Sequence, residues 1–350
     1  MKFGRIFFLG SFLFLSFQIL GQDLHFSQYA AAPLHLNPAL TGNIDNGKTR
    51  VVANYRNQWS QILVQDAYKS YMVSIDRRKE KSTGNYFGWG ISGARDISGA
   101  LEFGTTQGNL SMSFGKLFTG RDSTAHYIVG GGQIGLAKRN VDPTAALWPG
   151  RLPWEPLVLP PTLEGFGIDF LYADVNVGLA WLSNFGNRKS FLLGIAAAHL
   201  NEPNISFFVN TTVPLSVRTT IHAAAEFPLN SKLSVAPNFL YLKQGEQVTV
   251  NTGSSLRYLL PQNDKANFIQ AGLGFRTGNH IQGGGPLNTV ITTAGFSLRN
   301  FNLGISYDLT VSKLRQAGTA AGAFEVALAY VIRGKRITED LMEQAEELTF

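Results

Sequence analysis

The sequence predicts an all-β protein, a transmembrane outer-membrane β-barrel of about fourteen antiparallel strands. Three observations predict this fold. Apolar and polar residues alternate along short stretches through most of the chain, the composition is rich in glycine but poor in charge, and the first residues form an export signal. Only 15% of the 350 residues are charged, whereas about a quarter is usual in soluble domains. Part of the surface is therefore not expected to face water.

The first residues have the features of a secretory signal peptide. Lys2 and Arg5 precede an apolar run over residues 6–20, and Gly21 offers a cleavage site before Gln22. The run is shorter than the roughly 20 residues of a spanning helix, which favours a cleaved signal over a retained membrane anchor. We expect residues 1–21 to be removed and the remaining chain to be exported. No later run of about 18 apolar residues predicts a spanning helix.

Alternation predicts the strands that follow. In residues 301–311, FNLGISYDLTV, large apolar side chains occupy the odd positions and small or polar ones the even positions. Side chains on a strand point alternately to its two faces, so this stretch separates an apolar from a polar environment. Residues 51–59, 87–93, 171–181 and 324–333 behave alike. We expect strands centred near residues 54, 71, 91, 110, 130, 174, 194, 221, 237, 253, 272, 292, 306 and 328, with weak alternation near 130, 194 and 253.

A secreted sandwich or repeat would also alternate, but the two predicted faces favour a membrane barrel. The polar face is rich in Gly, Ser, Thr and Asn, which suits a wet lumen. The apolar face carries large aromatic residues near strand ends, as interface girdles do. A closed barrel is also the only sheet that leaves no unpaired backbone edge in lipid. The predicted girdle residues are Trp59, Trp89, Trp181 and Tyr330.

Connection lengths support an even number of strands. With an even number, both ends of the barrel lie in the periplasm, and short turns should alternate with longer outer loops. The two longest connections, residues 138–166 and 200–215, and the glycine-rich connection 278–286 then all fall outside. The expected division of the chain is residues 1–21 as signal peptide, 22–48 as an N-terminal segment at the periplasmic mouth, 49–333 as the barrel and 334–350 as a partly helical periplasmic tail.

The sequence offers no motif for catalysis, a cofactor or a metal. Its six histidines include no i, i+4 pair, and GWGISG at 88–93 matches G-x-G-x-x-G inside a strand, where it opens no helix. No cysteine is present. We expect no enzyme, no cofactor and no metal site. The candidate acid, base and nucleophile groups, which no spacing rule brings together, are His126, Asp169, Asp174 and Ser183.

Each of three polar or irregular stretches either binds a partner or is an ordinary solvated part of the surface. The loop 138–166 contains Trp148 and Trp154 and is either a partner-binding lid or a variable surface loop. The tail is either a partner-binding helix or a solvated extension. The turn RRKEK at 77–81 is either a solvated turn or a contact for an acidic partner or anionic lipid. Loss of Lys2 and Arg5 lowers the net charge from +6 to +4, too mild a charge to indicate nucleic-acid binding.

Three short motifs near the start of the predicted mature chain carry a family resemblance. FSQY at 26–29, LNPALTG at 36–42 and YRNQW at 55–59 resemble the N-terminal signature of the PorP/SprF family of outer-membrane proteins. That family accompanies the type IX secretion system and gliding motility, and it looks like a fourteen-stranded barrel. The helix-like tail is less typical of it. The matching residues are Phe26, Ser27, Gln28, Tyr29, Asn37, Pro38, Gly42, Tyr55, Arg56, Gln58 and Trp59.

The resemblance implies an accessory of type IX secretion. Such a barrel would bind, export or anchor one secreted, adhesin-like surface protein, recognised through its C-terminal sorting domain. Its partners would be outer-membrane lipid, that cargo and the secretion components. The alternative is a channel for small molecules, either porin-like or a transporter of hydrophobic substrates. The barrel prediction alone is compatible with both functions.

The motif-bearing stretch 23–42 has the period of neither a strand nor a helix. Because it directly precedes the first strand, we expect it to fold into the lumen or across the periplasmic mouth. Phe26, Tyr29 and Leu36 would pack on the wall, and Asn37 with Pro38 would form a turn. Gln28, together with Arg56 and Gln58 on the lumen face of the first strand, would hold it in place. The alternative is a flexible linker.

Overall fold

The structure, a computed structural model, describes residues 23–44, 47–60, 67–99, 101–120, 124–142, 167–260, 267–278, 287–311 and 322–332. Several sequence-based expectations concern residues outside these ranges. These are the signal peptide 1–21, most of the loop 138–166 with Trp148 and Trp154, and the tail 334–350. Among the described residues, no helix has the length and hydropathy needed to cross a membrane.

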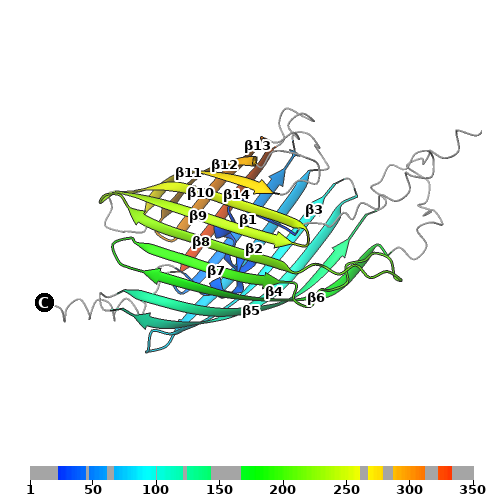
Figure 1. Cartoon of the computed structure of the whole chain (residues 1–350), viewed down its shortest axis with the longest axis horizontal. Coiled ribbons are helices and arrows are strands. Elements are labelled where there is room, and N and C mark those ends of the chain that lie inside the picture. The colour runs from blue at the N-terminus through cyan, green and yellow to red at the C-terminus, as the bar shows by residue number, and fades with distance from the viewer. Residues whose placement is uncertain are drawn as a thin grey trace, which may run out of the picture.

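Within the described residues, fourteen antiparallel strands form one closed barrel (Figure 1). Each strand pairs with its neighbours in sequence, and the first pairs with the last. Every predicted strand centre falls inside an observed strand, so the predicted fold class is confirmed. The strands are β1 (Thr49–Gln58), β2 (Tyr68–Glu80), β3 (Tyr86–Ser98), β4 (Phe103–Thr119), β5 (Ala125–Asn140), β6 (Asp169–Asn184), β7 (Ser190–Ala198), β8 (Arg218–Pro228), β9 (Leu233–Gln244), β10 (Gln247–Leu259), β11 (Phe268–Gly278), β12 (Leu287–Leu298), β13 (Phe301–Thr310) and β14 (Gly322–Ile332).

The barrel has a turn end and a loop end. At the turn end, where β1 begins and β14 finishes, the strands are joined by residues 81–85, 120–124, 185–189, 229–232, 260–267 and 299–300. At the loop end, the connections include 141–168, 199–217, 279–286 and 311–321. Outer-membrane barrels have short periplasmic turns and longer external loops. By this rule we expect the turn end to face the periplasm.

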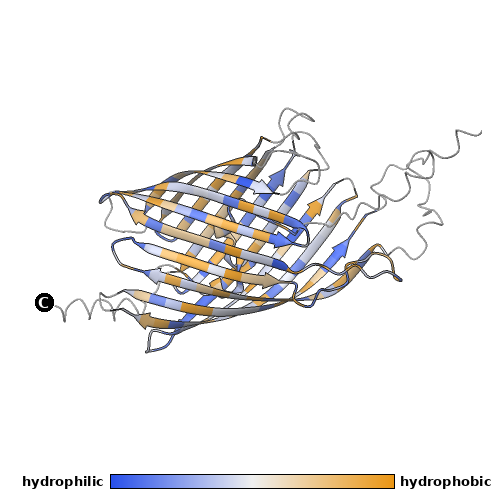
Figure 2. Cartoon of the chain, in the orientation of Figure 1, coloured by the Kyte–Doolittle hydropathy of each residue, from blue (hydrophilic) through white to orange (hydrophobic). Residues whose placement is uncertain are grey.

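Strand side chains alternate between lipid and lumen, which gives the banded hydropathy of Figure 2. On β6, Leu171 is 66% exposed on the outside, whereas Asp174 and Asn176 are buried inside. The predicted girdle residues Trp89, Trp181 and Tyr330 are also among the exposed large side chains. Trp59 differs, because it follows the last residue of β1 with a φ of 61° and packs edge-on against Tyr68.

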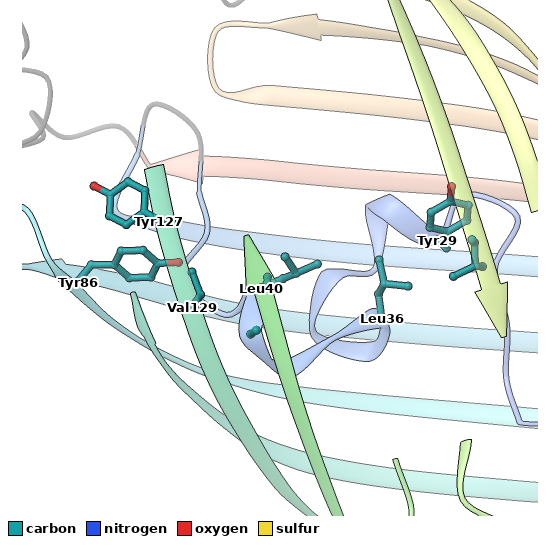
Figure 3. Packing of buried hydrophobic residues seen from close by; sticks show 9 residues of the cluster. Tyr29, Leu36, Leu40, Tyr86, Tyr127 and Val129 are labelled. Carbon is teal, nitrogen blue, oxygen red and sulfur yellow. The ribbon is translucent and has the colours of Figure 1, made fainter. Parts of the chain in front are cut away.

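The barrel is not hollow along its whole length, because residues 23–44, called the lumen segment below, lie inside it (Figure 1). This segment contains the short helices η1 (Tyr29–Ala31), α1 (Pro33–Leu36) and η2 (Pro38–Leu40). Figure 3 shows Tyr29, Leu36 and Leu40 of the segment packed against the wall. The hydrophobic core of the molecule therefore lies between the segment and the inner surface of the strands. Its wall residues include Tyr86, Tyr127, Val129, Ala180 and Leu240.

Candidate functional site

The lumen segment is the candidate site, because it brings together most of the motif residues and most of the buried polar groups. Prolines keep its helices short. Pro33 and Pro38 each occupy the first turn of a helix, where a missing N–H costs nothing. Asn37 separates the two helices, and its side-chain oxygen accepts a hydrogen bond from Ala39 N at 2.9 Å. The segment is thus a series of tight turns rather than one helix, which explains its lack of a regular period.

Hydrogen bonds join the lumen segment to strands all round the barrel. Near the loop end Asp23 meets groups at the ends of β7, β8 and β9, and near the turn end Gly42 meets β2. The segment therefore runs along the lumen between the two ends. Among the described residues, the wall residues that bond it are Arg50, Asn54, Arg56, Asp76, Ser113, Gln133, Leu179, Ile195, His199, Arg218, His222, Asn238, Gln244, Arg276, Asp308 and Glu325.

A buried cluster of charges holds the FSQY motif. It comprises Arg56 of β1, Arg276 of β11, Asp308 of β13 and Glu325 of β14, and is called the seam cluster because β1 and β14 close the barrel. Arg56 forms ion pairs with Asp308 at 3.0 Å and with Glu325. Arg276 pairs with Asp308 at 3.1 Å. Two positive groups thus balance two negative ones in a site where all four side chains are buried.

Ser27 connects the lumen segment to the seam cluster. Its backbone N–H donates to Glu325 Oε1 at 2.6 Å, and its hydroxyl donates to Asp308 Oδ2 at 2.7 Å. The same hydroxyl accepts from Arg56 at 2.9 Å. The next backbone N–H, that of Gln28, donates to Glu325 Oε2 at 3.0 Å. Removing one member of such a network leaves another charge buried without its partner, which typically costs about 3–5 kcal/mol.

The LNPALTG motif is held on the opposite side by a second set of contacts. The Asn37 amide donates to Leu179 O at 3.1 Å and to Ile195 O at 3.3 Å, and it lies 3.0 Å from His222 Nε2. Asn37 is fully buried. The side-chain amide of Asn37 therefore donates to backbone carbonyl oxygens of β6 and β7, and it links the segment to both strands.

Glycines in the wall make room for this motif. A Cβ added to Gly178 would overlap Asn37 Oδ1, and one added to Gly131 would overlap the backbone of Pro38 and Ala39. Gly194 faces Asn37 and His222 in the same way. The alternation near residues 130 and 194 is weak because apolar side chains such as Val129 and Leu192 also lie on the lumen face there, where they pack in the core with the segment.

At the turn end the segment is fixed by Asp76. This carboxylate accepts from Gly42 N at 2.8 Å and from Arg50 Nη2 at 2.8 Å. Arg50 also donates to the carbonyl oxygens of Asn43 and Leu40. Gly42 has a φ of 72° and lies so close to β3 that an added Cβ would be 2.7 Å from Gly88 Cα. Only glycine suits both the conformation and the space.

At the loop end a clamp holds Asp23. Its carboxylate lies 2.5 Å from His199 Nε2 and 3.1 Å from Arg218 Nη1, and His199 Nδ1 lies 2.9 Å from Asp174. Burial opposes ionisation of both Asp23 and His199. The pairing outweighs burial, because His199 and Arg218 lower the pKa of Asp23 below its usual range. In turn, Asp23 and Asp174 raise the pKa of His199 to about 9.

His35 lies beside the clamp and stays neutral. Burial and the charge of Arg218 lower its pKa to about 4, although it donates to Leu24 O at 2.7 Å. Arg218 also donates to His35 O at 3.3 Å. The clamp therefore joins Asp23 and the α1 helix to the start of β8. Small cavities of about 40 and 30 Å³ border it, room for only a few water molecules.

The structure brings some motif residues together and separates others. Ser27 and Gln28 meet Arg56, whose Nη2 also donates to Gln58 at 3.1 Å. The expected tie from Gln28 takes another route, since its bonds go to Glu325 rather than to Arg56 or Gln58. Tyr55 lies elsewhere, packed at a tilt against Tyr71 with ring centroids 5.2 Å apart. Trp59 is also outside the lumen contacts, beyond the end of β1.

Sequence reasoning missed half of the charged groups that hold the segment. Arg56, Asp308 and Glu325 fall on the polar faces of their predicted strands, but the alternation does not pair them, because these strands lie far apart in sequence. The available signal was a charged residue on the polar side of an otherwise uncharged strand, a position where an unpaired charge is costly. The same signal marks Arg276 on β11. The other residues that were missed, Arg50, Asp76 and Arg218, lie on strands that carry further charges and have no such signal.

The candidate catalytic groups do not converge. His126 Nδ1 lies 2.8 Å from Ser183 Oγ at the turn end. Asp174 instead pairs with His199, and Asp169 forms an exposed ion pair with Lys138 at 2.7 Å, both near the loop end. Within the described ranges, no group of three or more His, Asp or Glu side chains is placed to hold a metal ion.

Comparison with known proteins identifies a family. The profile described as "Type IX secretion system membrane protein PorP/SprF" matches residues 19–330. No curated protein matches the sequence. Among solved structures, the chain is similar to the toluene transporter TodX of Pseudomonas putida, with a TM-score of 0.45 and 10% identity over 85% of this chain and 92% of that one. It is also similar to CdiB of Escherichia coli, with a TM-score of 0.44 and 11% identity over 82% and 64% of the two chains.

Filling the space at Gly178 should displace the LNPALTG motif. We expect Gly178→Leu to expose η2, because the new side chain needs the volume that Asn37 occupies. The chain has no cysteine, so a single Leu40→Cys reports on this directly, and its labelling by a maleimide should accelerate about tenfold or more. Gly132→Leu on β5 is the matched control, since its added Cβ meets nothing within 4 Å. Equal labelling in both variants would contradict the packing described here.

Raising the pH should open the clamp at Asp23. His199 has a folded pKa of about 9, above the unfolded value of about 6.5. Its contribution is therefore complete below about pH 6.5 and is lost as the pH rises through about 9. A Leu24→Cys reporter, normalised to unfolded protein at each pH, should label faster at pH 9.5 than at pH 6.5. His199→Asn should label fast at both values, and a pH response that survives this substitution would show that another group controls the clamp.

Proposed function

Because the chain belongs to the PorP/SprF family of type IX secretion system membrane proteins, we propose that it binds, exports or anchors one secreted surface protein. The barrel lies in the outer membrane, as its family and its apolar outward face require. Its role in this proposal is not enzymatic. The cargo is an adhesin-like protein that carries a C-terminal sorting domain, and the other partners are the secretion components.

One observation carries the proposal, namely that the lumen is occupied by the chain's own lumen segment. Ion pairs and hydrogen bonds fix this segment at the seam cluster, at Asn37, at Asp76 and at the Asp23 clamp. A folded cargo cannot pass through a lumen filled in this way. The surfaces left for a large partner are the two rims of the barrel. A barrel with a filled lumen and two accessible rims suits an accessory protein. Such a protein would hold the cargo after another component has exported it.

The loop end offers an ordered surface for such a partner. In the loop 199–217, the Asn204 side chain accepts from Ser206 N at 3.1 Å and from Val213 N at 2.8 Å. Phe207 anchors the loop by packing against Phe103 and Phe170. The loop then exposes apolar side chains to the exterior, and Val209 is 80% exposed. Apolar groups held out by an ordered loop are typical of a surface that binds another protein.

The alternative function is a channel for small molecules. It requires the lumen segment to leave its place or to shift far enough to open a path. We propose instead that residues 22–48 act as a plug of the barrel formed by residues 49–333, and that the tail 334–350 lies in the periplasm. The motif residues Phe26, Ser27, Gln28, Tyr29, Asn37, Pro38, Gly42, Arg56 and Gln58 then serve mainly to seat the plug.

The plug is tested by conductance. We expect the full chain to be silent in planar bilayers and a chain lacking residues 23–40 to conduct, because that deletion empties the lumen. Gly178→Leu gives the same test without shortening the chain, and it should conduct at least intermittently, whereas Gly132→Leu should stay silent. A deletion variant that shows no conductance but still migrates as a folded barrel would contradict the plug.

The cargo role is tested by co-purification. The tagged chain, extracted from outer membranes in mild detergent, should carry one large exported protein with a C-terminal sorting domain and at least one secretion component. Deleting the gene should remove that one protein from the cell surface while growth on small nutrients is unchanged. An unrelated tagged barrel serves as control. Absence of any exported partner, together with a nutrient-specific growth defect, would favour the channel.

A further inference from the structure

The lipid-facing side of β2, β3 and β4 carries an unusual group of basic side chains near the turn end. Arg77 and Lys79 belong to the outward face of β2, Lys81 follows it in the turn, and Lys116 belongs to the outward face of β4. All four are exposed. They are called the basic patch below. Their position is set by strand parity, because the lumen face of β2 takes the even residues Asp76 and Arg78 instead.

Strand register arranges this surface in tiers from apolar to basic. Nearest the middle of the membrane, Ile75 lies opposite Ile91, which lies opposite Leu110. The next tier towards the periplasm joins Arg77 to Trp89, and the one after it joins Lys79 to Phe87 and Phe114. Lys81 and Lys116 lie at the rim. The surface therefore changes from aliphatic, through aromatic, to cationic over the depth of one leaflet.

The aromatic residues hold the basic groups at this surface. Lys81 Nζ lies 6.0 Å from the centre of the Phe114 ring, and Lys116 Nζ lies 5.2 Å from that of Phe118. Both rings are exposed on the outside of the barrel, by 46% and 42%. The ammonium groups are thus kept over the lipid-facing side rather than over the lumen.

No acid described in the structure neutralises the patch. Glu80 lies on the lumen side of β2, where it accepts from Arg78 at 2.7 Å, and Asp76 pairs with Arg50. None of the basic patch side chains has an ion pair among the described residues. Elsewhere on the described turn end, exposed basic residues are single at each turn, as at Lys189 and Lys232. A concentration of unpaired positive charge therefore faces one sector of the membrane.

We propose that the basic patch is a binding site for the headgroup of an anionic phospholipid in the periplasmic leaflet. The phosphate would lie among Lys79, Lys81 and Lys116, the glycerol region beside Trp89 and Phe87, and the acyl chains along Ile75 and Ile91. The occupant is a lipid rather than a soluble protein, because the same face continues into an aliphatic surface that lies in the hydrocarbon of the membrane. The site follows from the membrane location and is independent of the cargo proposal.

Native mass spectrometry of the full chain in detergent tests the site. We expect phosphatidylglycerol to bind in a defined adduct and phosphatidylcholine to bind much more weakly. The variant R77Q/K79Q/K81Q/K116Q should bind phosphatidylglycerol at least about tenfold more weakly, since each basic group near an anionic headgroup contributes about fivefold. The matched control R95Q/K189Q/K232Q/K243Q loses the same charge from exposed residues outside the patch, and it should bind like the parent chain. The variant K79R/K81R/K116R should also retain binding.

Three results would overturn the proposal. The first is equal weakening in the patch variant and its control, which would reduce the effect to net charge. The second is equal affinity for the two lipids. The third is a patch variant that keeps its lipid but loses a co-purifying secretion component, because the patch would then be a protein contact. Heat-dependent migration on gels confirms in each case that the barrel is folded, so a loss of lipid cannot be attributed to misfolding.

Discussion

The seam cluster is the interaction on which the rest of the structure depends. Arg56 and Glu325 face each other directly in the pairing of β1 with β14, and both are buried among the backbone of Ser27 and Gln28. A charge removed from water has to find a counter-charge and hydrogen-bond partners close by. Here the partners are supplied both by the strands and by the lumen segment. Closure of the barrel between β1 and β14 and binding of the lumen segment therefore depend on the same buried charges.

The wall on the other side of the lumen holds the segment at positions that have no side chain. Opposite the seam, β5, β6 and β7 present glycines where the Asn37–Pro38 turn approaches, so the backbone of the segment lies against the backbone of the wall. Interiors are packed as tightly as organic crystals, and a segment with short helical turns fits only where side chains are absent. The segment is therefore held between the buried charges of the seam cluster and the glycines of the opposite wall.

The strands were predictable from the sequence because lipid and lumen impose opposite preferences on successive residues. That contrast is lost near residues 130 and 194, where apolar lumen side chains such as Val129 and Leu192 face the segment instead of water, and there the pattern is weak. Register was not predictable, because sliding a strand by two residues leaves every side chain on the same face. Between β1 and β14, the pairing of Arg56 with Glu325, which lie at opposite ends of the chain, marks the correct register. The path of residues 23–44 was predictable only as far as prolines and Asn37 define turns. The Asp23 clamp depends on His199, in a loop that no local pattern relates to Asp23.

The direction of the lumen segment has a consequence for the order of assembly. Asp23 is bound at the loop end and Gly42 at the turn end, so the chain crosses its own barrel before β1 begins. A sheet that curls up from the periplasmic side can enclose this segment while β1 and β14 are still apart. Once they meet, Asp23 could reach His199 only by passing along the length of the lumen from the periplasmic mouth. The first residues of the folded chain thus act as a core around which the last strand pair is completed.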